Sequence, residues 1–165
     1  MTAGYEPVAD EREIPARLRA LGPRTVIYDV EPLVAHWDNG QTALDAGLAA
    51  VTATVAAVGG VQVLCFATNS ARSPSVPVAG PPGLRVSYLV SAHKPLRTAA
   101  YTGLPGPGVV VGDQIATDGI LARRLGYTFL HFRPDRGEMP PGPHLLAGCG
   151  DALRPLLFGR SRQPR

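Results

Sequence analysis

The chain has 165 residues, of which 45% are hydrophobic and 18% are charged, a composition typical of one globular domain. Its 19 glycines and 17 prolines follow no triplet repeat, which excludes a collagen helix and predicts many turns. Two cysteines, Cys65 and Cys149, are too few for a disulfide scaffold or a zinc cluster, so we expect a reducing, cytoplasmic setting.

The formal charge of +3 is concentrated at the C-terminal end. Residues 151–165 contain four arginines and one aspartate, whereas residues 1–150 are neutral. A short basic end does not form the basic groove that nucleic acids require, so we expect no nucleic-acid partner. We interpret residues 159–165 as a flexible tail that is either solvated or in peripheral contact with an anionic membrane surface.

Helices and strands alternate through the first half of the chain. The spacing of Ile14, Leu18 and Leu21 predicts a short helix, and residues 25–30 form an apolar run typical of a strand. Apolar residues at helical spacing predict a helix over about 42–58, and a compact apolar run predicts a strand over 61–66.

One uncharged stretch needs a choice between two interpretations. Residues 46–71 contain no charged side chain and are long enough to span a bilayer. Their hydrophobic period changes midway, however, from helical to strand-like, with Gly59 and Gly60 at the change. This pattern indicates a helix, a glycine turn and a buried strand rather than a membrane span.

The second half continues the same alternation. It contains predicted strands over 84–90, 109–111 and 127–132 and a predicted helix over 118–125. The prolines of residues 73–83 favour a loop, and after about Pro134 the sequence is typical of a loop with a short helix near 152–158. His131, within the last predicted strand, is interpreted as a packing residue.

Short apolar strands separated by helices predict an α/β fold. We expect a three-layer, Rossmann-like parallel sheet with helices on both faces. The sequence is interpreted as a single domain over residues 1–158, with a core of about 12–132. Its Arg-for-Lys bias is typical of a GC-rich bacterial gene.

Polar side chains follow four of the predicted strands, and the carboxyl ends of parallel strands are where such sheets bind ligands. The four clusters are Asp29 with Glu31, Thr68 with Asn69, Lys94, and the segment from Asp113 to Asp118. Asp29, Asp113 and Asp118 offer the hard oxygen ligands that Mg²⁺ prefers. Thr68 and Asn69 could hold phosphoryl oxygens, and Lys94, the chain's single lysine, could neutralise their charge. Asp29 could then attack phosphorus.

The ordered clusters resemble the four motifs of the haloacid dehalogenase (HAD) superfamily. They read Val-Ile-Tyr-Asp29-Val-Glu31, Phe-Ala-Thr68-Asn69-Ser70, Lys94-Pro95 and Gly112-Asp113-Gln114-Ile-Ala-Thr117-Asp118, within about residues 12–132. The form of the last motif, and Trp37-Asp38 after the first, are similar to the YqeG-like branch, which includes phosphatidylglycerophosphate phosphatases. The intervals between the first three motifs hold one helix and one loop, so we expect no cap domain.

This resemblance implies a role for each position. Asp29, Glu31, Thr68 and Lys94 would be catalytic, with Asp29 as the nucleophile and Glu31 as the general acid and base. Thr68, Asn69 and Lys94 would bind the phosphoryl group. Asp29, Asp113, Asp118 and the backbone carbonyl of Glu31 would bind Mg²⁺.

The first motif departs from the family's usual Asp-x-Asp-x-Thr, because it reads Asp29-Val30-Glu31-Pro32-Leu33. Glutamate keeps a titratable carboxyl but displaces it, and Leu33 removes a hydroxyl. The resemblance therefore leaves alternatives open. One is a Mg²⁺-dependent phosphatase acting through an aspartyl-phosphate on a phosphate monoester, with a lipid or other bulky substrate favoured by the open site. The other is a catalytically impaired binding or regulatory module, and a phosphotransferase is a third.

Overall fold

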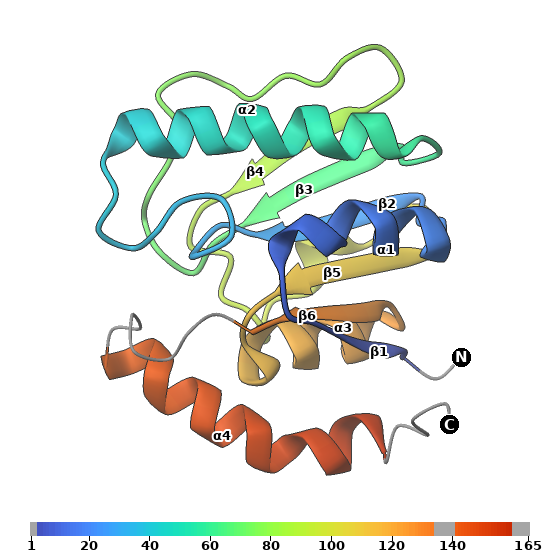
Figure 1. Ribbon diagram of the computed structural model, residues 1–165, viewed down its shortest axis with the longest axis vertical. Coiled ribbons are helices and arrows are strands. Elements are labelled where there is room, and N and C mark those ends of the chain that lie inside the picture. Colours follow the sequence, from blue (N-terminus) through green and yellow to red (C-terminus); the bar gives the residue numbers. More distant parts are fainter. Residues whose placement is uncertain (1–2, 134–140, 160–165) are drawn as a thin grey trace.

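The computed structural model describes residues 3–133 and 141–159. Within these residues, six parallel strands form one sheet in the spatial order β1-β6-β5-β2-β3-β4 (Figure 1). The strands are β1 (Tyr5–Val8), β2 (Thr25–Asp29), β3 (Val63–Ala67), β4 (Arg85–Leu89), β5 (Gly108–Gly112) and β6 (Thr128–Phe132). β2 pairs with β5 on one side and with β3 on the other, so the end of β2 lies near the middle of the sheet.

Helices cover both faces of this sheet. They are α1 (Ile14–Leu21), α2 (Gln41–Val58), α3 (Ile120–Leu125) and α4 (Pro141–Phe158), with short helical turns η1 (Glu11–Glu13), η2 (Ala99–Tyr101) and η3 (Ile115–Gly119). Successive side chains of a strand point to opposite faces. Tyr28 of β2 therefore packs in the same cluster as Leu48 of α2, whereas Ile27 packs in the cluster of Leu121 from α3. The α/β, Rossmann-like prediction is confirmed, and no cap domain is evident in the described residues.

α2 is long and apolar enough to cross a membrane by length and composition alone, with a mean hydropathy of 1.3. Its buried residues Leu44, Leu48, Thr52 and Val55 recur every three or four positions. The three apolar members of this stripe belong to the core cluster on that face of the sheet. One helix of this kind is weak evidence for a membrane span, because core helices meet the same test.

Two elements differ from the sequence expectation. β1 is an edge strand whose residues pair with β6, from Tyr5 opposite Phe129 to Val8 opposite Phe132. Its four residues include Glu6 and a proline, so they do not form the apolar run from which a strand is predicted. The proline is tolerated because the strand lies at the edge of the sheet.

α4 is the second difference, because it begins at Pro141 and not near residue 152. Its glycines and Pro155 lower helix propensity, which hides the helix from a sequence pattern. One glycine has a packing role: a Cβ at Gly150 would lie 2.9 Å from the Cβ of Ile115. Close packing on η3 therefore compensates for the poor propensity. Residues 134–140 and 160–165, expected to be loop and tail, lie outside the described residues.

Candidate phosphate and metal site

The four predicted polar clusters meet at one edge of the sheet. Asp29 is the last residue of β2, and Thr68 directly follows β3. Asp113 directly follows β5, and Lys94 lies in the turns after β4. These side chains are buried, as is that of Asp118 in η3. The structure thus brings together residues that stand at four separate strand ends in the sequence.

Lys94 lies at the centre of this cluster. Its ammonium Nζ is 2.6 Å from Asp29 Oδ1 and 2.7 Å from Asp118 Oδ1. Burial opposes the charged form of the lysine, but the carboxylates of Asp118 and Asp29 outweigh burial and raise its pKa above the ordinary value. Lys94 is therefore charged at neutral pH and holds two carboxylates from different strand ends.

A third carboxylate, that of Asp113, lies close to the two that contact this ammonium. Asp29, Asp113 and Asp118 each place one carboxylate oxygen within 4.8 Å of the others. Neither oxygen of Asp113 has a hydrogen-bond partner among the described residues, although both are buried. Burial and the carboxylate of Asp118 raise the pKa of Asp113 to about 8, and the same two causes raise the pKa of Asp29 well above its ordinary value. When ionised, the group carries more negative charge than Lys94 balances.

This donor set fits a divalent cation. A doubly charged ion would neutralise the excess, and carboxylate oxygens are the ligands that Mg²⁺ prefers. It would also give the buried oxygens of Asp113 the partner that no described residue supplies. Asp29, Asp113 and Asp118 are therefore the residues that could hold a metal.

Gly112 gives Asp118 the space to enter the cluster. A Cβ on Gly112 would lie 2.5 Å from Cγ and Oδ2 of Asp118, a distance that no side chain tolerates. Asp118 Oδ2 also accepts hydrogen bonds from the backbone N–H of Gln114, at 3.4 Å, and from the Thr117 hydroxyl, at 3.3 Å. Asp118 is therefore positioned by three residues of this segment: Gly112, Gln114 and Thr117.

Glu31 faces a different set of partners. The Thr68 hydroxyl donates to Glu31 Oε2 at 2.6 Å, and the Ser70 hydroxyl donates to Oε1 at 3.1 Å. The guanidinium of Arg72 lies 3.6 Å from Oε1. The Glu31 carboxylate is therefore outside the three-carboxylate group, and a metal-ligand role for its backbone carbonyl stays a prediction. The hydroxyl of Thr68, predicted to bind phosphate, already has a partner in Glu31.

Asn69 supports the lysine, and its predicted role in binding phosphate stays a prediction. Its Nδ2 donates to the backbone carbonyl of Lys94 at 3.1 Å, and its Oδ1 accepts from the backbone N–H of Lys94 at 2.7 Å. Ser91 and His93, in the same turn, have positive φ values of 46° and 50°, which side-chain-bearing residues disfavour. The Asn69 amide helps to hold this unusual turn, and so places the lysine.

His131 has a role that the sequence does not reveal. Its Nε2–H donates to the backbone carbonyl of Asp113 at 3.0 Å, so its Nδ1 accepts from the Tyr5 hydroxyl at 2.8 Å. Burial lowers the pKa of His131 to about 4, which keeps the ring neutral. The ring therefore positions Asp113 in addition to packing. Only the register of β5 against β6, which sets Gly112 opposite His131, places the two together.

A cavity of about 260 Å³ opens over the cluster. Its walls carry Asp29, Glu31, Asn69 and Lys94, together with residues that the motifs did not single out. Arg72 is one of these: its guanidinium donates to the backbone carbonyls of His36 and Asn39, which ties the segment around Trp37 to the site. Leu146 of α4 closes another side, so an element outside the predicted core contributes to the wall.

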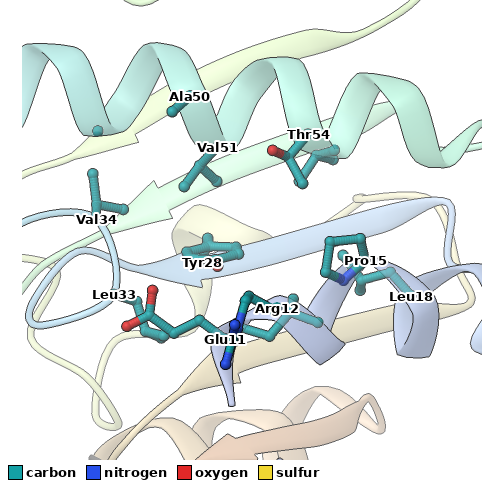
Figure 2. A pocket seen from close by; sticks show the side chains of 13 residues that line it. Glu11, Arg12, Pro15, Leu18, Tyr28, Leu33, Val34, Ala50, Val51 and Thr54 are labelled. Carbon is teal, nitrogen blue, oxygen red and sulfur yellow. The ribbon is translucent and has the colours of Figure 1, made fainter.

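A second, largely apolar cavity of about 340 Å³ lies between α1 and α2. Figure 2 shows Tyr28 on its floor, with Leu33 and Val34 at one end and Val51 on the α2 side. Leu33 is 6% exposed and belongs to the apolar core cluster. Leu33, at the position where the HAD motif has threonine, therefore packs in the core on this face and supplies no hydroxyl to the site.

Comparison of the chain with protein-family models, with curated proteins and with solved structures finds no match in any of the three. The geometry of the site consequently carries the functional argument.

Proposed function

We propose that the protein is a Mg²⁺-dependent phosphatase of the HAD type, which hydrolyses a phosphate monoester through an aspartyl-phosphate on Asp29. The observation that carries this proposal is the buried group of Asp29, Asp113 and Asp118, in which Lys94 contacts two carboxylates and both oxygens of Asp113 are unpartnered among the described residues. A purely structural cluster of buried charges is expected to be fully paired, whereas here the carboxylate of Asp113 has no hydrogen-bond partner among the described residues.

Asp29, Asp113 and Asp118 would hold Mg²⁺, which when bound would reduce the repulsion between the carboxylates and a phosphoryl group. The nucleophile would be a carboxylate oxygen of Asp29, a residue that also lines the cavity. As this oxygen bonds to phosphorus, the bond from phosphorus to the leaving oxygen breaks. Lys94 lies within contact distance of Asp29 and would stabilise the charge on the transferred group.

Glu31 would supply the proton steps. Its carboxylic acid would protonate the leaving oxygen, and its carboxylate would then take a proton from the water that attacks phosphorus. This second attack breaks the bond to Asp29 and releases inorganic phosphate. Glu31 lines the cavity together with Asp29, which supports this role.

The substrate class follows from the open side of the site. No cap is evident over the cavity in the described residues, and its wall includes Trp37, Arg72 and Leu146. A site without a lid suits a phosphate carried by a lipid or another bulky molecule better than a small metabolite that needs enclosure.

A second candidate function is a binding or regulatory module with the same fold. Two observations favour it: Leu33 packs into the apolar core where the family motif has threonine, and Glu31 is engaged by two hydroxyls and Arg72. Glu31→Gln discriminates between the two candidates. The phosphatase predicts a loss of turnover of about 100- to 10,000-fold, whereas the binding module predicts no turnover to lose.

The first experiment is phosphate release from an aryl phosphate, with Mg²⁺ or with a chelator, by wild type and by Asp29→Asn. Asp45→Asn, on α2 and outside the cluster, is the matched control. We expect metal-dependent turnover in wild type and in Asp45→Asn, and none in Asp29→Asn. Equal turnover in Asp29→Asn and wild type would exclude the aspartyl-phosphate, and folded wild-type protein without turnover on aryl and lipid phosphates would favour the binding module.

A further inference from the structure

Arg72 connects the loop after β3 with the segment that follows β2. Its guanidinium donates to the backbone carbonyl of His36 at 2.9 Å and to that of Asn39 at 2.8 Å. Trp37 lies between these two acceptors in the sequence, so the guanidinium bridges a turn that contains the tryptophan. The backbone N–H of Asn39 also donates to the carbonyl of His36 at 3.1 Å, within the same turn. We call residues 36–39 the Trp37 segment.

The backbone of Arg72 is held independently of its side chain. Its N–H donates to the Ser70 hydroxyl at 3.2 Å, and its carbonyl accepts from the Tyr88 hydroxyl at 3.0 Å. The side chain is 23% exposed, and one of its nitrogens lies 3.6 Å from Glu31 Oε1. Arg72 is therefore anchored in the loop after β3, and its guanidinium extends from there to Glu31 and to the Trp37 segment.

An arginine at the wall of a candidate phosphate site could instead bind an anion directly. Each terminal nitrogen of Arg72, however, already donates to a backbone carbonyl, and the carboxylate of Glu31 lies beside one of them. The planar fork of arginine can bridge two acceptors in this way, whereas the ammonium of lysine is a compact point charge. The geometry therefore favours a role in positioning the Trp37 segment.

Trp37 lines the cavity of the candidate site together with Asp29. Its side chain is partly exposed, and the ring of His36 packs edge-on against it, with the ring centroids 5.5 Å apart. Leu146 of α4 adds a second apolar side chain to the wall. A partly exposed aromatic ring in the same cavity as the reacting carboxylate offers contact area to the apolar part of a ligand.

We propose that the leaving group of the substrate packs against Trp37, and that Arg72 is the positioning residue that holds Trp37 in the wall. This inference rests on the proposed function, because it takes the phosphate of the substrate to lie over Asp29. It adds to that function a preference for leaving groups with a broad apolar surface, set by a residue that does not react.

The first test measures affinity and not turnover. Naphthyl phosphate and phenyl phosphate carry the same phosphoryl group and differ by one ring in the leaving group. Calorimetry with Mg²⁺ in the Asp29→Asn background, which cannot form the aspartyl-phosphate, should show about tenfold tighter binding of the naphthyl ester. Trp37→Ala should lower this preference to about twofold or less, whereas Trp37→Phe should keep most of it, because phenylalanine retains an aromatic face.

A double-mutant cycle in the same background tests the role of Arg72. Arg72→Gln and Arg72→Lys should both lower the naphthyl preference as Trp37→Ala does, because neither replacement has the fork that bridges two carbonyls. Adding Arg72→Gln to Trp37→Ala should lower it no further, since the arginine acts through the tryptophan. The matched control is Gln41→Ala. It removes a 3.1 Å hydrogen bond from the start of α2 to the carbonyl of Ser73, in the loop after β3, and does not alter the cavity lining.

Fluorescence gives a readout that needs no ligand. Trp37 is the only tryptophan in the sequence, so the emission of the protein reports the surroundings of this side chain. Arg72→Gln should shift the emission to longer wavelength and make it more accessible to quenching by acrylamide, whereas Gln41→Ala should leave both as in wild type. Far-UV circular dichroism and thermal unfolding check that each variant is folded.

Several results would overturn the inference. Equal affinity for the two esters, or no binding of either, would exclude the contact between the leaving group and Trp37. Full recovery of the naphthyl preference in Arg72→Lys would assign Arg72 to charge and not to positioning. Unchanged fluorescence and preference in Arg72→Gln would show that the Trp37 segment keeps its place without the arginine. None of these measurements depends on turnover, so a failure of the proposed function is seen separately, in the release of phosphate by wild type.

Discussion

The side-chain amide of Asn69 makes two hydrogen bonds to the backbone of Lys94, one in each direction. A residue in the loop after β3 thus fixes the position of a lysine in the turns after β4. Lys94 in turn reaches the carboxylates of Asp29, at the end of β2, and Asp118, beyond β5. Four strand ends are therefore held together through Lys94. Substitutions of this lysine should lower the stability of the fold as well as any activity.

Replacing Lys94 by Met should destabilise the protein strongly. The change leaves two buried carboxylates without their ammonium, and breaking a buried pair in this way costs about 3–5 kcal/mol. Urea unfolding in the presence of a chelator measures the effect. Arg19→Met, which removes an exposed cation, is the control and should cost little. A loss below about 1 kcal/mol for Lys94→Met would show that the carboxylates are protonated in the folded protein.

Replacing Asp113 by Asn should stabilise the metal-free protein at alkaline pH and abolish its response to Mg²⁺. The pKa of Asp113 is raised to about 8 in the folded state, so folding takes up a proton between about pH 4 and pH 8. Stability contributed by the protonated form is consequently lost as the pH rises through this range. At pH 9 with a chelator, we expect the variant to be more stable than wild type by at least about 1 kcal/mol.

The loss of the response to Mg²⁺ can be measured separately, as a shift of the unfolding temperature. Wild type should unfold at a higher temperature when Mg²⁺ is added, because the ion binds only the folded state. Asp113→Asn should show no such shift, and Asp45→Asn should behave as wild type does. A full Mg²⁺ shift in Asp113→Asn would remove this residue from the metal site.

Gly112→Ala should displace Asp118. The new methyl group would lie 2.5 Å from the Asp118 carboxylate, so either the strand end or the carboxylate must move. We expect a loss of about 1–3 kcal/mol and a weaker Mg²⁺-induced shift of the unfolding temperature. Gly40→Ala is the control, since a Cβ there meets no atom within 4 Å. Wild-type behaviour of Gly112→Ala would mean that Asp118 has more freedom than its contacts indicate.

His131→Phe should remove an acid-sensitive contribution to stability. The folded-state pKa of His131 is lowered to about 4 from an ordinary value of 6.5, mainly by burial. Protonation therefore favours the unfolded state, and stability is lost as the pH falls from 6.5 towards 4, by up to about 3 kcal/mol. Arg133 strengthens this shift, whereas the carboxylates of Asp151 and Asp118 oppose it.

The measurement compares urea unfolding of wild type and His131→Phe at pH 7.5 and pH 4.5. At the higher pH the variant should be less stable, because the hydrogen bonds to Asp113 and Tyr5 are lost. The deficit should shrink or reverse at the lower pH. A deficit of the same size at both values would indicate that the histidine is charged or solvated when folded.

The sheet could be predicted because its buried strands are short apolar runs with polar residues directly after them. Val26 to Tyr28 and Val109 to Val111 are unambiguous in this respect, and the parallel arrangement then brings Asp29 and Asp113 to one edge. β1 and the part of α4 before residue 152 could not be predicted, since each depends on a partner: β1 on pairing with β6, and this part of α4 on the contact of Gly150 with η3.

The candidate site shows the same division. The sequence shows which strand ends carry polar residues, but it does not show which of these residues form hydrogen bonds with one another. The sequence predicts that Thr68 and Asn69 bind phosphate, but it does not indicate that Thr68 donates to Glu31 or that Asn69 holds Lys94. His131 gives no local signal of its contact with Asp113, because that contact follows from strand register.

The position of β1 has a consequence for how the chain is made. Among the described strands β1 pairs with β6 alone, so its hydrogen bonds must wait until residues 128–132 have been synthesised. Such a pairing between distant segments slows the final stage of folding. The four strands from β2 to β5 pair among themselves and can assemble before β6 is available. We therefore expect the nascent chain to bring Asp29, Asp113 and Asp118 together before β1 has paired with β6.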